Sequence, residues 1–210
     1  MPQKIETTVY TFDELNERAK ETARDWMREC ASEFFSDDAE MLYDDFQACA
    51  ACLGIAFSSH SVKLMNGTTR QAPDIFWSGF SSQGDGASFA GSYSYVKGAP
   101  KAIRAHAPQD KELMRIADEL QALQRTHAYR ITAGIHQGRG NYSHAYSMKI
   151  DTEYCDYATA EAVSECLRDF ANWMYRQLEA EYDYRLSNES IDDGIRANEY
   201  TFTDDGKRFG

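Results

Sequence analysis

Apolar residues recur at helical spacing in several parts of the chain, and these parts are predicted to be helices. The first begins at Tyr10–Leu15, where Thr11 and Glu14 occupy the positions of a capping box, and its apolar stripe continues to Cys30. A second helix begins at residues 36–38 and ends at Gly54. The other predicted helices cover residues 110–126, 159–182 and 190–198. Residues 159–182 form the longest of them, long enough to lie across a whole sheet.

Between these helices the apolar residues alternate with polar ones, which is typical of strands in a half-buried antiparallel sheet. The predicted strands cover residues 55–64, 74–80, 87–96, 129–136 and 142–150, followed by an extended segment at 199–202. Turns are expected at Asn66-Gly67, at residues 83–86 and at residues 138–141. No repeat or linker marks a boundary. The pattern therefore predicts one α+β domain over residues 1–210, with about five antiparallel strands packed against several helices, including a long C-terminal helix.

Composition adds an acidic charge to this picture. The 210 residues include 34 acidic and 22 basic ones, a net charge of −12, while 42% are hydrophobic and 13% aromatic. A chain this apolar is not a disordered acidic tail, and a protein that binds nucleic acid through its phosphates needs a basic face. No segment is apolar and long enough for a membrane span or a secretory signal. We therefore expect a cytoplasmic protein that binds neither nucleic acid nor membranes directly, and whose partner has a basic surface.

The acidic residues are unevenly distributed. Between residues 179 and 205, nine acidic residues face only Arg185 and Arg196. The candidate partner-binding carboxylates are Asp37, Asp38, Asp44, Asp45, Glu181, Asp183, Asp192 and Asp193. One interpretation is a solvated face that keeps the protein in solution. The other is that these carboxylates imitate phosphates and occupy a basic groove built for nucleic acid.

Aromatic residues concentrate around the predicted turn at residues 83–86. The candidate contact residues there are Trp77, Phe80, Asp85, Tyr93 and Tyr95. Exposed rings of this kind anchor protein interfaces. The alternative is that the rings form the core face of the sheet, which the alternation alone would explain.

Candidate catalytic chemistry is sparse. His136 and His144 flank the turn at residues 138–141, and they are cross-strand neighbours only if Gln137 pairs with Ser143. Cys49 and Cys52 form a CxxC pair, but no second pair or suitable histidine pair accompanies it. We therefore interpret both as small buried helix residues, with redox or metal chemistry as the alternative. We predict no catalytic residue, no metal site and no cofactor.

Three segments resemble a family of small phage and prophage proteins. They are Tyr10–Leu15 with Ala19-Lys20, residues 77–89, and residues 167–170 with 173–179. Members are often labelled as antitoxin-like proteins of toxin–antitoxin stability systems. The resemblance runs from about Val9 to Lys207, and its most specific part is the stretch from Ser78 to Gly86. This chain departs from the family pattern at Ser82 and Ser88, and in a longer connection between Lys63 and Gln71. The resemblance implies a phage-borne accessory protein that blocks a host factor, and it carries over no catalytic residue.

These observations together predict a non-enzymatic, phage-encoded inhibitor. Its target would be a bacterial nucleic-acid-handling defence protein, as for an anti-CRISPR or anti-restriction protein, bound through the acidic surface. One alternative is an antitoxin-like protein that neutralises a partner toxin. Another is a metal-dependent enzyme that uses His136 and His144.

Overall fold

The structure, a computed structural model, describes residues 6–138 and 143–210. The α-helices are α1 (Glu17–Glu33), α2 (Phe35–Ala39), α3 (Tyr43–Leu53), α4 (Ala99–His106), α5 (Lys111–Thr126), α6 (Tyr157–Leu186) and α7 (Asn188–Ala197), and the 3-10 turns are η1 (Phe12–Glu14), η2 (Glu40–Leu42) and η3 (Ala145–Ser147). The strands are β1 (Tyr10–Thr11), β2 (Ile55–Phe57), β3 (Ser59–Lys63), β4 (Thr69–Pro73), β5 (Ile75–Ser78), β6 (Gly86–Phe89), β7 (Gly91–Ser94), β8 (Thr132–Gln137), β9 (Met148–Glu153), β10 (Thr201–Phe202) and β11 (Arg208–Phe209). All strand pairs are antiparallel. The predicted α+β class and the long C-terminal helix are therefore confirmed.

The chain divides into two compact units. Residues 1–41 and 179–210 form one, which we call the terminal unit, and residues 42–178 form the other, the central unit. Helix α6 contributes residues to both, and each unit is described below by itself. The organisation as one domain over residues 1–210 stays a prediction.

The terminal unit is built on α1 and α7. Its buried apolar side chains are Phe12, Leu15, Ala19, Ala23, Ile191, Ile195 and Phe202. A small sheet in the order β1-β10-β11 joins the two ends of the chain. The predicted capping box is present, because the Glu14 carboxylate accepts hydrogen bonds from the backbone and hydroxyl of Thr11. It caps η1, however, and α1 begins only after Asn16, whose side chain accepts from the Ala19 amide.

The central unit contains a four-stranded sheet in the order β2-β7-β8-β9, and two separate ladders, β3-β4 and β5-β6. The predicted strands 55–64 and 87–96 are each broken, at Ser58 and at Ala90. These two residues and Asp74 bond one another through their backbones, with N–O distances of 2.8–2.9 Å. Each broken strand leaves one ladder and joins another at this point. The largest sheet consequently has four strands rather than about five.

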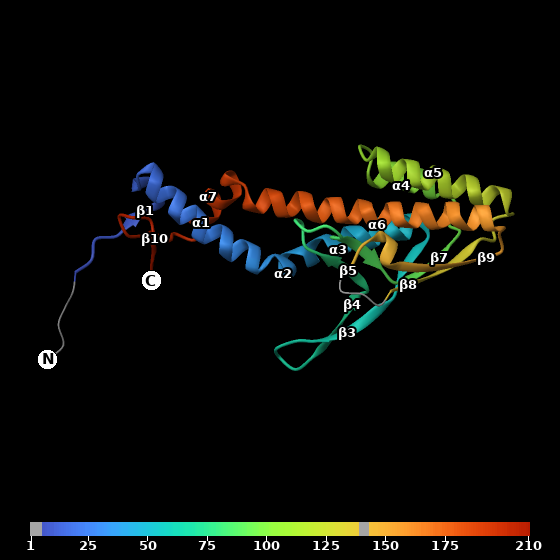
Figure 1. Cartoon of the computed structure of the whole chain (residues 1–210), viewed down its shortest axis with the longest axis horizontal. Helices are drawn as coiled ribbons and strands as arrows, with labels where there is room; N and C mark the ends of the chain where they lie inside the picture. Colours follow the sequence, from blue (N-terminus) through green and yellow to red (C-terminus); the bar gives the residue numbers. More distant parts are fainter. Residues whose placement is uncertain (1–5, 139–142) are drawn as a thin grey trace. The chain divides into compact units, whose positions relative to one another are not determined.

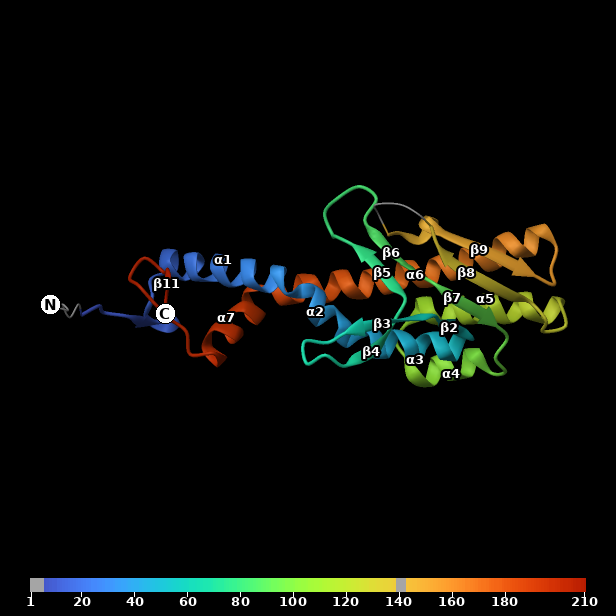
Figure 2. The same cartoon turned by 90° about the horizontal axis from the view of Figure 1, so that it is seen from below.

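Helix α6 covers the sheet of the central unit, and it runs along the strands in both views (Figures 1 and 2). Phe170 on α6 is fully buried, and its ring contacts those of Phe57, Phe89 and Trp173 at centroid distances of 5.6–6.4 Å. Beside α6 lies α5, which begins after Asp110 as predicted, with the Asp110 carboxylate accepting from the amides of residues 112 and 113. The unit is therefore a sheet with helices packed against it.

Some elements of the central unit are not those predicted. Helix α4 and strand β4 were not expected, and β4 begins within the connection between Lys63 and Gln71. The turn predicted at Asn66-Gly67 is confirmed, with Gly67 at a φ of +83°. Residues 139–142 of the turn predicted at 138–141 lie outside the described residues. None of the helices in the described ranges is both long and apolar enough to cross a bilayer.

Candidate functional site

The acidic charge is concentrated in the terminal unit. Residues 1–41 and 179–210 hold 20 acidic and 9 basic residues, a net charge of −11, whereas residues 42–178 hold 14 acidic and 13 basic residues, a net charge of −1. The terminal unit has 73 residues, about a third of the chain. Almost the whole net charge of the protein therefore belongs to its smaller unit.

Several of the predicted partner-binding carboxylates have partners within their own unit. Asp38 and Glu181 both bind the guanidinium of Arg185, and Asp192 binds Arg24. In the central unit, Asp45 Oδ1 lies 2.9 Å from His106 Nε2, within hydrogen-bond distance. Asp38 and Asp192 therefore join separate helices of the terminal unit, whereas Glu181 pairs with Arg185 within α6.

The remaining predicted carboxylates are better placed to meet a partner. Asp193 lies on the surface, 3.6 Å from Arg196, with 75% of its side chain exposed. Asp37, Asp44 and Asp183 are exposed, and in the described part of the chain their carboxylates make no ion pair. Asp37, Asp183 and Asp193 belong to the terminal unit. These three carboxylates remain open to solvent there.

The Arg24–Asp192 pair is the most enclosed of these ion pairs. Arg24 donates from Nε and Nη2 to the two carboxylate oxygens at 2.7 and 2.9 Å, and only 14% and 16% of the two side chains are exposed. Such two-point contacts are among the stronger hydrogen bonds in proteins. The hydrogen bond from Arg24 has the largest effect on the pKa of the Asp192 carboxyl and holds it below the ordinary value of 3.8. Burial raises this pKa, but its effect is smaller.

This pair predicts an acid-sensitive contribution to stability. Because the pKa of Asp192 is lower in the folded state, its ionised form stabilises the fold above about pH 4, and this contribution is lost as the pH falls through the lowered pKa. Replacing Arg24 by glutamine is expected to lower the free energy of unfolding at pH 7 by about 1.5–3 kcal/mol and to remove this part of the acid sensitivity. Denaturant unfolding between pH 7 and pH 3 measures both effects.

The control for that experiment is Arg196→Gln. Arg196 also makes a two-point contact, with Asp13, but on the surface, where 46% and 65% of the side chains are exposed. Surface ion pairs contribute little to stability. Equal losses in the two variants would contradict a special role for the enclosed pair.

The predicted aromatic contact residues do not form one exposed hairpin surface. Tyr93 on β7 is only 2% exposed, its hydroxyl accepts from the Gln124 amide at 3.1 Å, and burial raises its pKa to about 12. Tyr95 lies against Tyr129, with ring centroids 4.6 Å apart. Tyr93 is therefore a core residue and is not accessible to a partner.

Trp77 and Phe80 are half-buried. Their rings stack on each other at 5.3 Å, and Phe80 stacks on Tyr175 of α6 at 5.6 Å. The Asp85 carboxylate accepts from the amides of Ser81 and Ser82, at 3.0 and 2.6 Å, so it closes the turn between β5 and β6. The interpretation as a core face fits these contacts better than the interpretation as an interface.

The structure does not bring His136 and His144 together across a hairpin. In the observed register Gln137 pairs with Met148, and His136 pairs with Lys149. His144 lies before β9 and caps η3, where its Nδ1 accepts from the Tyr146 amide at 3.1 Å. The strand pairing of Gln137 with Ser143, on which a neighbouring position of the two histidines depended, does not occur. The alternative of a metal or acid–base couple loses its geometric basis.

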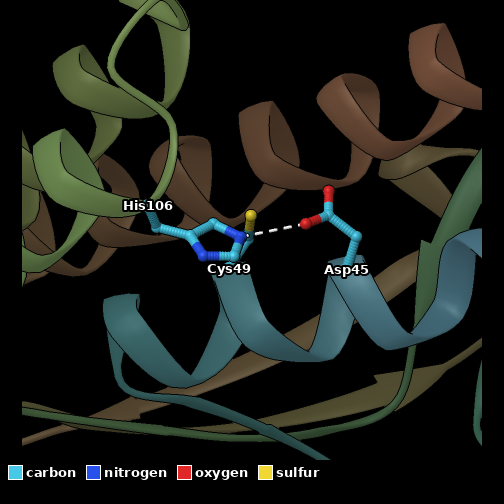
Figure 3. A group of neighbouring side chains, drawn as sticks. All are labelled: Asp45, Cys49 and His106. Atoms are coloured by element: carbon cyan, nitrogen blue, oxygen red, sulfur yellow. Dashed lines mark hydrogen bonds and ion pairs between the residues drawn. The ribbon is translucent and has the colours of Figure 1, made fainter.

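A different histidine, His106, lies in a group of side chains whose types could hold a metal ion, and the sequence analysis did not identify this group. Asp45 and Cys49 are four residues apart on α3 and lie on one side of it, and His106 is the last residue of α4 (Figure 3). One ligand atom from each lies within 4.8 Å of the other two. The sequence signal was weak, since the carboxylate and the thiol share a helix but the imidazole comes from a helix that was not predicted.

Cys49 forms the enclosed side of this group. It is 1% exposed, in agreement with its interpretation as a buried helix residue, while 57% of the Asp45 side chain and 37% of the His106 side chain are exposed. Burial, followed by the negative charge of Asp45, raises the pKa of the Cys49 thiol to about 12. Without a bound cation the thiol is therefore protonated at neutral pH and is a poor nucleophile.

Comparison with known families places part of this chain in a described family. A family model described as a domain of unknown function, DUF8835, matches residues 39–188, which include the central unit and the Asp45, Cys49 and His106 group. No curated protein and no solved structure matches the chain. Most of the acidic terminal unit lies outside the matched residues. The match covers well over half of the length of this chain, which therefore belongs to the DUF8835 family.

Proposed function

We propose that this protein is a non-enzymatic binding protein whose terminal unit docks its carboxylates on the basic, nucleic-acid-binding groove of a bacterial protein. The observation that carries the proposal is the net charge of −11 on the terminal unit beside −1 on the central unit. A charge spread evenly over the surface would serve solubility alone. Its concentration on one compact unit creates a local field that attracts a basic partner and speeds encounter.

The setting of the proposed interaction follows from the resemblance to phage proteins, which stays a prediction. In that setting the partner is a defence protein such as a CRISPR effector or a restriction enzyme, and binding takes place in the bacterial cytoplasm. Basic grooves of such proteins bind phosphates spaced along a backbone, and carboxylates fixed on helices present a comparable pattern of negative charge. Asp37 on α2 and Asp193 on α7 are exposed carboxylates of this kind.

The test is capture of partners from a bacterial lysate on the immobilised protein, in about 0.1 M and about 1 M salt. Over this range the Debye length falls from about 10 Å to about 3 Å, which screens contacts between exposed charges. We expect a nucleic-acid-handling protein that is retained in low salt, released in high salt and displaced by added DNA or RNA. Captured partners are identified by mass spectrometry, and their binding to purified variants of this protein is then measured.

A charge reversal on the terminal unit is expected to slow association with the captured partner about tenfold, since steering by charge raises association rates at least that much. The variant is Asp37→Lys with Asp183→Lys, chosen because both carboxylates are exposed and hold no internal cation among the described residues. Asp38 and Asp192 are avoided because they bind Arg185 and Arg24. Association rates from surface plasmon resonance give the comparison.

The matched control is the double reversal Glu153→Lys with Glu161→Lys, which changes the charge equally on exposed positions of the central unit. It is expected to leave association nearly unchanged. Equal effects of the two double variants, or capture that is insensitive to salt, would contradict docking through the terminal unit. An empty capture at both salt concentrations would leave the proposal without a target.

A further inference from the structure

Three different metal-binding groups converge where α4 meets α3. The group consists of the Asp45 carboxylate, the Cys49 sulfur and the His106 imidazole, and Figure 3 shows the three side chains directed toward one another. His106 Nε2 lies 2.9 Å from Asp45 Oδ1. Asp45 and Cys49 lie on α3 and His106 ends α4, and these two helices contact each other, so all three residues come from helices.

We propose that Asp45, Cys49 and His106 bind a zinc ion. A thiolate, an imidazole and a carboxylate form a ligand set typical of zinc, whereas magnesium and calcium take oxygen ligands. Tetrahedral zinc with bonds of about 2.0–2.3 Å separates its ligand atoms by about 3.3–3.6 Å. Three ligand atoms within 4.8 Å of one another reach this arrangement by small rotations of their side chains.

The alternative is an ordinary surface pair of histidine and aspartate that happens to lie over a buried cysteine. The chain contains other pairs of this type, His60–Asp74 at 2.7 Å and His127–Asp156 at 3.3 Å. Within the described residues, only the pair at Asp45 belongs to a group of three ligand types within reach of one ion. The other pairs therefore serve as internal controls.

The surroundings of the site are suited to a cation. Cys49 lies at its buried base, and the partly exposed Asp45 and His106 leave an approach from solvent. Cys52 lies almost one helical turn beyond Cys49 and provides a further sulfur near the site. Asp110 is occupied, since one oxygen caps α5 and the other accepts from the Trp173 indole at 2.6 Å. On binding, the Cys49 thiol transfers its proton to solvent and the thiolate joins the ion.

Titration of the full-length protein with cobalt(II) tests the site. Cobalt replaces zinc in such sites, and a bound thiolate gives a charge-transfer band in the near ultraviolet. We expect the band to saturate at one ion per chain and to vanish when zinc is added. His106→Gln is expected to weaken binding at least about 100-fold, since even groups that only support a metal ligand contribute 10–100-fold. Cys49→Ser is expected to abolish the band.

Two control variants separate this site from a general effect. His127→Gln alters a histidine–aspartate pair without a cysteine, and Cys166→Ser alters an equally buried cysteine beside the Glu119 carboxylate. Both are expected to retain the cobalt band. Absence of a band in the unaltered protein, or binding by His106→Gln at full affinity, would overturn the proposal, as would loss of the band in either control.

Folding of each variant is checked by circular dichroism. His106 is partly exposed, so His106→Gln decides the outcome even if Cys49→Ser does not fold. The zinc site lies in the central unit and the proposed partner surface in the terminal unit, so the cobalt titration and the partner capture succeed or fail independently.

Discussion

Replacing Phe170 by alanine is expected to lower the free energy of unfolding by about 3–5 kcal/mol, the range for large aromatic residues in well-packed cores. The Phe170 ring is fully buried and contacts three other aromatic rings, from β2, β6 and α6 itself. Truncation leaves a cavity at the contact between α6 and the sheet of the central unit. Denaturant unfolding followed by tryptophan fluorescence and circular dichroism measures the loss.

The control for Phe170 is Tyr157→Ala, also on α6 but with the tyrosine 80% exposed. Removal of an exposed ring usually changes stability by less than about 0.5 kcal/mol. A loss below about 1 kcal/mol for Phe170→Ala would mean that α6 does not pack on the sheet as described.

The second large effect is expected at Gly54, which ends α3 at a φ of +86°. A Cβ at this position would lie 2.0 Å from the Ser94 carbonyl oxygen, whose residue also donates its amide to the Gly54 carbonyl. Gly54→Ala therefore has two costs in stability: about 1–2 kcal/mol for a side chain in the left-handed conformation, and about 1–3 kcal/mol for overpacking. Unfolding experiments are expected to show a total loss of about 2–5 kcal/mol.

Gly98→Ala isolates the first of these two contributions. Gly98 has a φ of +84°, almost the same as Gly54, but a Cβ there would meet no atom within 4 Å. Its replacement is expected to cost about 1–2 kcal/mol. Similar losses at both glycines would show that the approach of Ser94 to Gly54 relaxes at little cost.

Local signals in the sequence predicted the elements that local interactions define. Helix α5 begins after Asp110 because its carboxylate caps the first amides, and α3 ends at Gly54 because only glycine adopts that conformation without strain. Helix α4 was not predicted because it has eight residues, of which only Ala99 and Ile103 are buried. A segment this short shows too little periodicity to be distinguished from a loop.

The sequence pattern could not predict where strands break or which distant residues form pairs. The alternation through residues 87–96 continues across Ala90, although the chain there passes from one ladder to another by bonding with Asp74 and Ser58. Arg24 and Asp192 are 168 residues apart. Asp38 and Asp192 were interpreted as acidic surface, because the sequence does not show that Arg185 and Arg24, 147 and 168 residues away, lie beside them.

The uneven charge also determines how copies of this protein behave toward one another in solution. Mutual repulsion between molecules keeps a protein dispersed, and here nearly all of it originates from residues 1–41 and 179–210, because residues 42–178 are almost neutral. The colloidal stability of the whole chain thus depends on a third of its residues. Polycations that cover that third, or acidification toward the isoelectric point near 4.8, should precipitate the folded protein by removing its net charge.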